Sequence, residues 1–318
     1  MIVNVILVVV GIAGLFFGGE WLVRGSSRLA RSFGISPLII GLTIVAFGTS
    51  TPELLVSVSA ALQGISDVSI GNIVGSNIAN VGLILGLAGL TYPIVIHVGL
   101  IRREIPIMLA VSILAFVLAL DGQLSLLDGL VLLAGFAAFN LLMFQATLRE
   151  RETGRLTDED LQEGDDDKAV VNRPIEVLRV LVGIGILMVG ANLTVDNAII
   201  LARFFQVSEL FIGLTLVAVG TSLPELATSV VAAMRKESDI AIGNVVGSNI
   251  FNILFILGLT SVIQPLPVSP EVVSSDMPVM ILFALVLMPL VRNKLISRRE
   301  AVALLVAYLG YVIWAFLR

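Results

Sequence analysis

Long apolar runs, separated by short polar or turn-forming clusters, make up most of the chain. Cutting the sequence at those clusters leaves ten segments, at residues 2–23, 37–62, 69–90, 104–120, 125–147, 175–196, 208–234, 240–263, 277–291 and 300–317. Most of them have the ~17–25 residues that a helix needs to cross a hydrocarbon core about 30 Å thick. The two shortest, 104–120 and 277–291, need flanking residues to span it. The pattern therefore predicts about ten membrane-spanning helices.

Composition supports this class of protein. Of the 318 residues, 57% are hydrophobic and 14% are charged, which gives more apolar surface than one soluble core can bury. We therefore expect an all-α polytopic membrane protein that lies in the lipid bilayer. The first apolar run has no basic residues before it and no small-residue cleavage site after it, so residues 2–23 should remain as the first span. The chain has no cysteine, and we expect no disulfide framework, thiol nucleophile or cysteine-bound zinc.

The charges predict an orientation. Nine of the 24 acidic residues lie within 149–174, so the net charge of −5 reflects this one polar segment and does not indicate a nucleic-acid partner. Basic residues gather in alternate connections, and the other connections hold one, Arg203. Because basic residues stay on the cytoplasmic side, we expect a multi-pass protein of the cell (plasma or inner) membrane with both termini outside.

The acidic stretch "DEDLQEGDDD" at 158–167 lacks the ligand order of an EF-hand, and we interpret it as a linker.

The chain repeats itself. Residues 36–88 match residues 208–260 at 33 of 53 positions, with a constant offset of 172 and no gap. Each copy contains five predicted helices, an odd number, so the second copy should enter the membrane in the opposite sense. Inverted repeats of this kind are typical of secondary transporters, which bind their substrates near the midplane where the copies meet. We therefore predict a first five-helix repeat at 1–148, an acidic cytoplasmic loop at 149–174 and a second, inverted repeat at 175–318.

The repeated helices should be interrupted in the membrane. The first copy reads "GLTIVAFGTSTPELLVS" and the second "GLTLVAVGTSLPELATS". Gly48 and Gly220 loosen each helix, while Pro52 and Pro224 remove a backbone donor and clash with the preceding turn. Such a break frees carbonyl oxygens, which a membrane tolerates only where they line a cavity or bind a ligand.

Polar side chains recur around each break. A carboxylate follows a threonine by four residues, so the two share one helix face. The next helix, "GNIVGSNIAN" in one copy and "GNVVGSNIFN" in the other, carries hydroxyls and amides on one face and a Gly-xxx-Gly pattern that allows close packing. Hard oxygen donors without a nearby His or Cys suit Ca²⁺ or Na⁺ better than zinc, copper or iron. The residues of this pattern are Thr49, Glu53, Asn72, Ser76, Asn80, Thr221, Glu225 and Asn252.

These blocks resemble the α-1 and α-2 repeats of the cation/Ca²⁺ exchanger superfamily, in particular its prokaryotic Na⁺/Ca²⁺ exchangers. The α-1 motif corresponds to residues 41–87 and the α-2 motif to 213–259. The resemblance implies a Na⁺/Ca²⁺-exchanger-like fold of two inverted repeats, with cation sites among the second, third, seventh and eighth helices. It also implies that Glu53 and Glu225 bind both transported ions. The further ligands that it implies are hydroxyl or backbone oxygens of Thr49, Thr221, Ser50, Ser222, Ser76 and Ser248, carbonyls of Ala46 and Ala218, and the amides of Asn80 and Asn252.

The resemblance predicts an antiporter, neither an enzyme nor a cofactor-binding protein, that exchanges Na⁺ for Ca²⁺ by alternating access while the first and sixth helices slide. Some members of the superfamily have Asp where this chain has Asn252, so the predicted site holds two carboxylates and no third acid. Two carboxylates balance one Ca²⁺ or two Na⁺, which leaves stoichiometry open. An H⁺/Ca²⁺ or other divalent-cation/proton antiporter is the alternative, since a carboxyl buried without a cation favours its neutral form. The oligomeric state also stays open.

Three further titratable residues are not expected in the site. Glu20 lies one turn before Arg24 and should have a structural or interfacial role. Asp196 falls near the end of the sixth segment and should be interfacial. His97, the single histidine, should be solvated in a connection.

Overall fold

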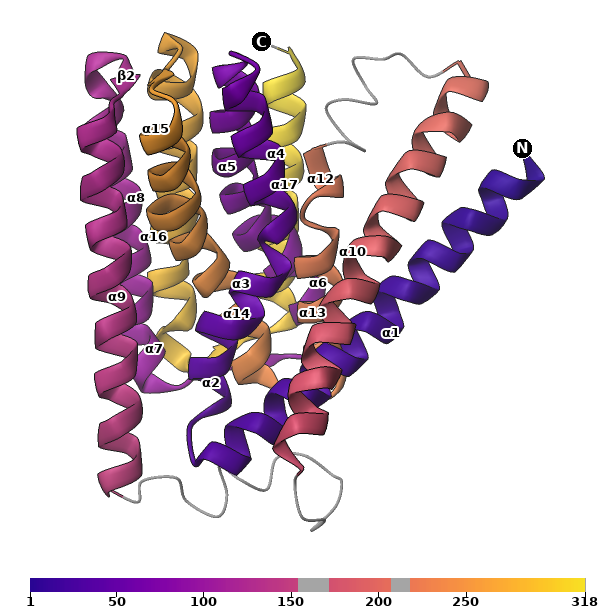
Figure 1. Ribbon diagram of the computed structural model, residues 1–318, viewed down its shortest axis with the longest axis vertical. Helices are drawn as coiled ribbons and strands as arrows, with labels where there is room; N and C mark the ends of the chain where they lie inside the picture. The colour runs from indigo at the N-terminus through magenta and orange to yellow at the C-terminus, as the bar shows by residue number, and fades with distance from the viewer. Residues whose placement is uncertain (154–171, 207–217, 318) are drawn as a thin grey trace.

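The computed structural model describes residues 1–153, 172–206 and 218–317, and these are almost entirely helical (Figure 1). The first copy begins with the long helix α1 (Ile2–Phe33). The interrupted second span follows as α2 (Pro37–Ile40), the π-helix η1 (Gly41–Val45), α3 (Ala46–Thr49) and α4 (Thr51–Leu62). The third span consists of α5 (Ser66–Ala79), η2 (Asn80–Ile84) and α6 (Leu85–Thr91). The copy ends with β1 (Ile94–Val95), α7 (Val98–Arg102), α8 (Glu104–Leu118), η3 (Ala119–Asp121), β2 (Gln123–Leu124) and α9 (Leu126–Thr153).

The second copy has the same order of elements. It begins with α10 (Arg173–Phe204), and then α12 (Ala218–Gly220) and α13 (Leu223–Met234) form the described part of its interrupted span. The next span consists of α14 (Ser238–Phe251), η5 (Asn252–Leu257) and α15 (Gly258–Ile263). The chain closes with β3 (Leu266–Pro267), η6 (Val272–Asp276), α16 (Met277–Leu290), η7 (Val291–Asn293), β4 (Leu295–Ile296) and α17 (Arg298–Leu317).

The prediction of an all-α polytopic membrane protein is confirmed. Within the described residues, eight helices are long and apolar enough to cross a membrane, or nine when 37–49 and 51–62 count as one span bent by 46°. The remaining expected span, 208–234, is represented by α12 and α13, and its first part (208–217) lies outside the described residues. The first residues of the predicted α-2 motif, 213–217, belong to the same stretch. Residues 154–171 of the predicted acidic loop also lie outside the described residues. Helix α9 runs to Thr153 and α10 starts at Arg173, so both helices continue into the loop predicted at 149–174.

The first helix is longer than predicted. We expected it to end at residue 23 because arginines follow, but α1 continues to Phe33. Those arginines are paired: Arg28 lies 3.3 Å from a carboxylate oxygen of Glu176 on α10, and Arg31 lies 3.5 Å from Glu237. Gly34, with φ of 61°, then ends the helix in the left-handed conformation that glycine adopts readily.

Two short antiparallel sheets join the copies. In one sheet Ile94 of β1 faces Ile296 of β4, and in the other Leu124 of β2 faces Leu266 of β3. A shift of 172 residues carries β1 onto β3 and β2 onto β4, so the two sheets are related by the same offset as the sequence repeat. Each sheet therefore takes one strand from each copy.

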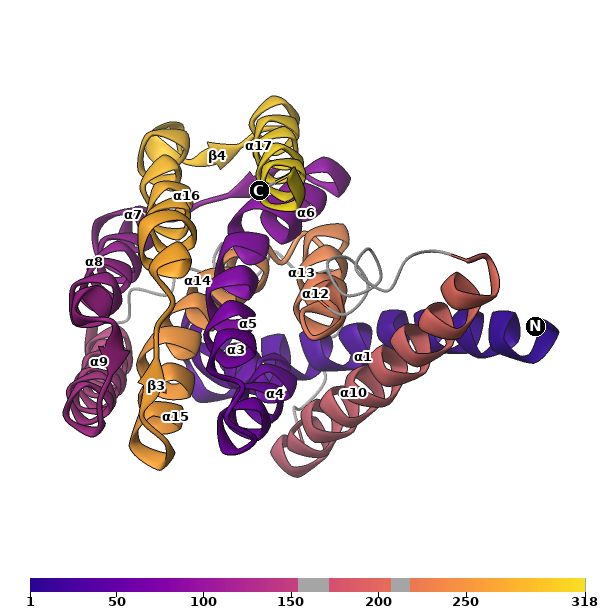
Figure 2. The ribbon, with the colours of Figure 1, turned by 90° about the horizontal axis from the view of Figure 1, so that it is seen from above.

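Helix α14 lies in the interior, with every residue from Ile240 to Phe251 buried (Figure 2). It packs tightly on the first copy, because a Cβ on Gly243 would lie 3.2 Å from the Gly41 Cα and one on Gly247 would lie 2.6 Å from the Leu42 carbonyl oxygen. The Gly-xxx-Gly pattern of this helix thus permits the close approach that the sequence suggested.

Helices α1 and α10 lie side by side at one edge of the molecule in both views, opposite α9 (Figures 1 and 2). Glycines bring their backbones together: a Cβ on Gly18 would lie 2.8 Å from the Leu187 backbone nitrogen, and one on Gly190 would lie 2.8 Å from the Gly11 carbonyl oxygen. The two helices therefore form one closely packed pair.

Candidate cation site

The two glutamates of the repeated motifs are completely buried. Glu53 lies in the first turn of α4 and Glu225 in the first turn of α13, each one residue after a proline. The backbone before each helix is the same in both copies, with φ and ψ of −83° and 8° at Ser50 and of −87° and 7° at Ser222. A helix N-terminus carries partial positive charge, which favours a carboxylate at this position. The sequence repeat is thus also a repeat of local geometry.

Each carboxylate is held by a serine of the other copy. Ser50 donates a hydrogen bond from Oγ to Oε1 of Glu225 over 2.8 Å, and Ser222 donates from Oγ to Oε1 of Glu53 over 3.1 Å. Ser76 joins this group, since its hydroxyl oxygen lies 3.2 Å from that of Ser222. These contacts connect the two interrupted spans directly.

The threonines make a second pair of contacts between the copies. Thr49 donates from Oγ1 to Oδ1 of Asn244 over 3.0 Å, and Thr221 donates from Oγ1 to Oδ1 of Asn72 over 3.2 Å. The amide nitrogen of Asn72 also donates to the backbone oxygen of Glu53 over 3.3 Å, so Asn72 stabilises the break.

Asn244 has the matching role in the second copy. Its amide nitrogen donates to the backbone oxygen of Glu225 over 3.4 Å and to Oγ of Ser229 over 3.0 Å. Asn244 was not among the predicted ligands. Its identity with Asn72 in the repeat was the available signal.

Several buried oxygens around the glutamates have no hydrogen-bond partner among the described residues. Their burial requires compensation, because an isolated carboxylate or amide oxygen costs free energy when it is removed from water. A cation bound among them would supply that compensation, and an all-oxygen donor set suits Ca²⁺ or Na⁺. No group of three or more His, Cys, Asp or Glu that could hold a metal occurs in the described part of the chain, in keeping with two carboxylates supplemented by neutral oxygens. The oxygens are Oε2 of Glu53, Oε2 of Glu225, Oδ1 of Asn80, Oδ1 of Asn252 and Oγ of Ser248.

The two alanines are placed differently from the side-chain ligands. The carbonyl oxygen of Ala46 accepts a hydrogen bond from the backbone nitrogen of Ser50 over 3.0 Å, which leaves its second lone pair. Ala218 is the first residue of α12, directly after the stretch that is outside the described residues.

The three titratable residues expected outside the site do lie elsewhere. Glu20 lies 3.2 Å from Arg24 and also pairs with Arg235. Asp196 is exposed. His97 is half exposed, as expected for a connection, but its Nε2 also lies 3.4 Å from a carboxylate oxygen of Asp239.

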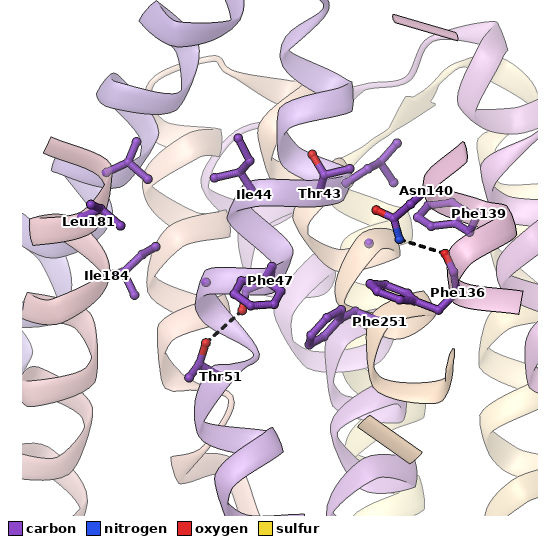
Figure 3. Close-up of a pocket in the computed structure, with 14 residues that line it drawn as sticks. Thr43, Ile44, Phe47, Thr51, Phe136, Phe139, Asn140, Leu181, Ile184 and Phe251 are labelled. Atoms are coloured by element: carbon purple, nitrogen blue, oxygen red, sulfur yellow. Dashed lines mark hydrogen bonds between the residues drawn. The ribbon is translucent and has the colours of Figure 1, made fainter. Parts of the chain in front are cut away.

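An apolar cavity of about 450 Å³ lies beside the first broken span, between α3, α9 and α10 (Figure 3). Phenylalanines from three elements line it. Its polar side chains are satisfied by their own helices: Thr51 donates to the carbonyl of Phe47 over 3.0 Å, and Asn140 to that of Phe136 over 2.8 Å. No carboxylate of the described residues lines this cavity, so it lacks the negative charge that a cation site needs, and the candidate site is the group of buried oxygens around the glutamates.

Comparisons with known proteins show similarity to sodium/calcium exchangers over nearly the whole chain. The family described as "Sodium/calcium exchanger protein" matches twice, at residues 3–145 and at 175–317. The inner membrane protein YrbG of Escherichia coli K12 is 41% identical over 99% of this chain and 96% of its own length. The sodium/calcium exchanger MaX1 of Methanosarcina acetivorans is 33% identical over 99% of both. A solved structure of the sodium-calcium exchanger NCX_Mj is 34% identical, covers 98% of both chains and superposes with a TM-score of 0.83.

Proposed function

Because the chain belongs to the sodium/calcium exchanger family, we propose that it is a secondary antiporter that exchanges Na⁺ for Ca²⁺ at a site between its two copies. One observation carries the proposal: Glu53 and Glu225 are both buried, each with one oxygen bound by a serine of the other copy and one oxygen without a partner among the described residues. Two carboxylates balance one Ca²⁺ or two Na⁺. Since both cations would use the same oxygens, binding of one displaces the other, which is the requirement for exchange.

The proposed ligands are those of the two repeated motifs. Glu53 and Glu225 supply charge to both ions, and neutral oxygens complete the coordination, since Ca²⁺ takes about 6–8 oxygens. The set is Thr49, Thr221, Ser50, Ser222, Ser76, Ser248, Asn80 and Asn252, with carbonyls of Ala46 and Ala218.

Access to this site is proposed to alternate as α1 and α10 slide together. Helix α10 lies against both broken spans, because a Cβ on Gly48 would lie 2.9 Å from Cγ1 of Ile184 and one on Gly220 would lie 2.8 Å from Cγ2 of Val195. A displacement of this helix therefore changes the cover over both halves of the site. The close packing between α1 and α10 supports their motion as one unit.

The positions of basic residues support an arrangement in which residues 149–174 face the cytoplasm and both termini face outside. Because the natural chain has no cysteine, a single cysteine placed at either end can be labelled from one side of intact cells. Labelling of both termini by an impermeant reagent from outside is the expected result, and protection of both would reverse the orientation.

The test of the function is ⁴⁵Ca²⁺ uptake into proteoliposomes that contain only this protein. Vesicles loaded with Na⁺ are compared with matched vesicles that carry a pH gradient and no Na⁺ gradient. Uptake driven by outward Na⁺ is the expected result. Uptake driven only by protons would assign the same site to an H⁺/Ca²⁺ antiporter, and the absence of flux under both conditions would refute the proposal.

A further inference from the structure

Two asparagines that were not among the predicted ligands lie between the copies. Asn77 on α5 and Asn249 on α14 are buried, and each side chain reaches the backbone of the other. The amide nitrogen of Asn249 donates to the carbonyl oxygen of Asn77 over 3.2 Å, and that of Asn77 donates to the carbonyl oxygen of Asn249 over 3.3 Å. A backbone carbonyl only accepts hydrogen bonds, so it fixes which end of each amide faces it.

The fixed amides in turn orient the neighbouring ligands. With its nitrogen engaged, Asn249 presents Oδ1, which accepts a hydrogen bond from the amide nitrogen of Asn80 over 2.9 Å. Asn77 does the same for the other copy, since its Oδ1 accepts from the amide nitrogen of Asn252 over 3.0 Å. The amide nitrogens of Asn80 and Asn252 are thereby engaged, whereas their Oδ1 atoms have no hydrogen-bond partner in the part of the chain that the structure describes.

We propose that Asn77 and Asn249 are positioning residues, which hold the amides of Asn252 and Asn80 with their oxygens toward the cation site. This inference rests on the proposed function. A flipped Asn80 would set its Oδ1 against that of Asn249 and turn two N–H donors toward the cation. The backbone carbonyl of Asn77 fixes the amide of Asn249, and the amide of Asn249 then fixes that of Asn80. The same relay runs from the carbonyl of Asn249 through Asn77 to Asn252, so each copy orients the amide ligand of the other.

The arrangement predicts a crossed dependence. Removing the Asn249 side chain releases Asn80 and leaves Asn252 held, because Asn77 is fixed by the backbone oxygen of residue 249, which any substitution retains. Asn252 lies only three residues from Asn249 on the same span, whereas Asn80 belongs to the other copy, so a general packing defect would disturb Asn252 at least as much as it disturbs Asn80. A positioning role therefore predicts that substitution of Asn249 is coupled to Asn80 and not to Asn252, whereas a packing defect predicts coupling to Asn252 as well.

The experiment measures equilibrium binding of ⁴⁵Ca²⁺ to the purified full-length protein without Na⁺. Asn249→Leu replaces the amide with an apolar side chain of similar size, and thermal unfolding checks that the variant is folded. We expect Asn249→Leu to weaken Ca²⁺ binding by about 10- to 100-fold, the usual effect of removing a group that orients a metal ligand. In an Asn80→Ala background the same substitution should weaken binding by less than about twofold, whereas in an Asn252→Ala background it should retain its full effect, as independent sites do.

The mirror cycle uses Asn77→Leu and should show coupling to Asn252 and independence from Asn80. If a leucine variant does not fold, the alanine variant replaces it in the same cycle. Equal effects of Asn249→Leu in both backgrounds, or no effect on binding at all, would overturn the positioning role.

Glu53→Gln separates this failure from failure of the proposed function. Loss of Ca²⁺ binding in Glu53→Gln together with absent crossed coupling would refute only the inference about Asn77 and Asn249. A wild-type protein that binds no Ca²⁺, or that binds it equally well after Glu53→Gln and after Asn80→Ala, would refute both.

Discussion

At the scale of single residues, the two oxygens of each glutamate differ in their contacts. Oε1 of Glu53 and of Glu225 accepts from a serine, while Oε2 of each has no partner among the described residues. The serine fixes the carboxyl group, and the open oxygen keeps its capacity for a cation. Full burial makes the charge costly unless a cation balances it.

Glu53→Gln and Glu225→Gln are each expected to abolish Na⁺-driven Ca²⁺ uptake and to leave folding intact. The glutamine oxygen can still accept from the serine, but one of two negative charges is lost and an amide nitrogen replaces an oxygen facing the cation. Flux in proteoliposomes and elution as a single species on gel filtration are the measurements. Glu20→Gln is the matched control, since Glu20 pairs with arginines outside the site, and it should retain uptake. Uptake near the wild-type rate by Glu53→Gln or Glu225→Gln would show that the substituted glutamate is not required for transport.

The repeat, together with the resemblance to the exchanger superfamily, predicted Glu53, Ser222 and Ser76 as ligands but not how they pair. Glu53, Ser222 and Ser76 are far apart along the chain, and only the packed helices reveal that the serine of one copy binds the glutamate of the other. Asn77 and Asn249 were overlooked because the prediction followed the four-residue spacing of Asn72, Ser76 and Asn80, which passes over Asn77 and its repeat partner. Their contact arises where α5 and α14 meet, which no spacing within one helix encodes.

At the scale of elements, close contact between α14 and η1 positions the second copy against the first broken span. Gly247 is the tightest point, where a Cβ would lie 2.6 Å from the Leu42 carbonyl oxygen and 2.7 Å from its Cα. A backbone neighbour cannot rotate away as a side chain does. The contact therefore requires glycine for its size.

Gly247→Ala should lower the free energy of unfolding by about 1–3 kcal/mol, the typical cost of inserting a group into a packed interior. Thermal unfolding in detergent measures the effect. Gly310→Ala on α17 is the control, because a Cβ there meets nothing within 4 Å among the described residues and alanine is the better helix former. A Gly247→Ala protein as stable as the wild type would show that α14 and η1 separate without cost.

Long apolar runs predicted the existence of the helices well, because each helix must cross the hydrocarbon core of the membrane. Their ends were harder to predict. Arg28 and Arg31 resemble the end of a span in sequence, yet ion pairs with Glu176 and Glu237 allow α1 to continue past them. The two-residue strands gave no local signal either, since a strand this short exists only through its partner.

At the scale of the whole molecule, the α1 and α10 pair lies at one edge and contacts both broken spans, which makes it the candidate moving part. Gly19 of α1 faces α13, where a Cβ would lie 3.4 Å from a methyl carbon of Val231. Gly25 of α1 faces α10 instead, where a Cβ would lie 2.9 Å from a methyl carbon of Val180. A cross-link at Gly19 would restrain movement of the pair against α13, and a cross-link at Gly25 would restrain only movement of α1 against α10.

A disulfide between Gly19→Cys and Val231→Cys should stop Ca²⁺ uptake on oxidation, and reduction should restore it, because the bond ties the pair to α13. The Gly25→Cys and Val180→Cys bond lies within the pair and should leave uptake largely unchanged. The natural chain lacks cysteine, so each bond is the single disulfide present. Undiminished uptake by the oxidised Gly19 and Val231 variant would exclude sliding between α1 and α13.

Neither copy completes the site or the sheets by itself. If the chain is divided within 154–171 and both pieces are expressed together, they should assemble and catalyse Na⁺-driven Ca²⁺ uptake. Either piece alone should give none, because Glu53 and Glu225 each depend on a serine from the other piece. Co-purification of the pieces and flux are the measurements, and uptake by one piece alone would place the whole site within one copy.

The two small sheets have a consequence for the ancestry of the chain. Because β1 with β4 and β2 with β3 are the same pairing seen twice, two identical half-length chains inserted in opposite senses would form both sheets. In such a dimer every mutation changes both halves together. Fusion into one gene removes that constraint, and Ala79 and Phe251, or Thr51 and Leu223, occupy matching positions with different residues. The two faces of the membrane, which differ in voltage and ion content, can then each select their own side chains.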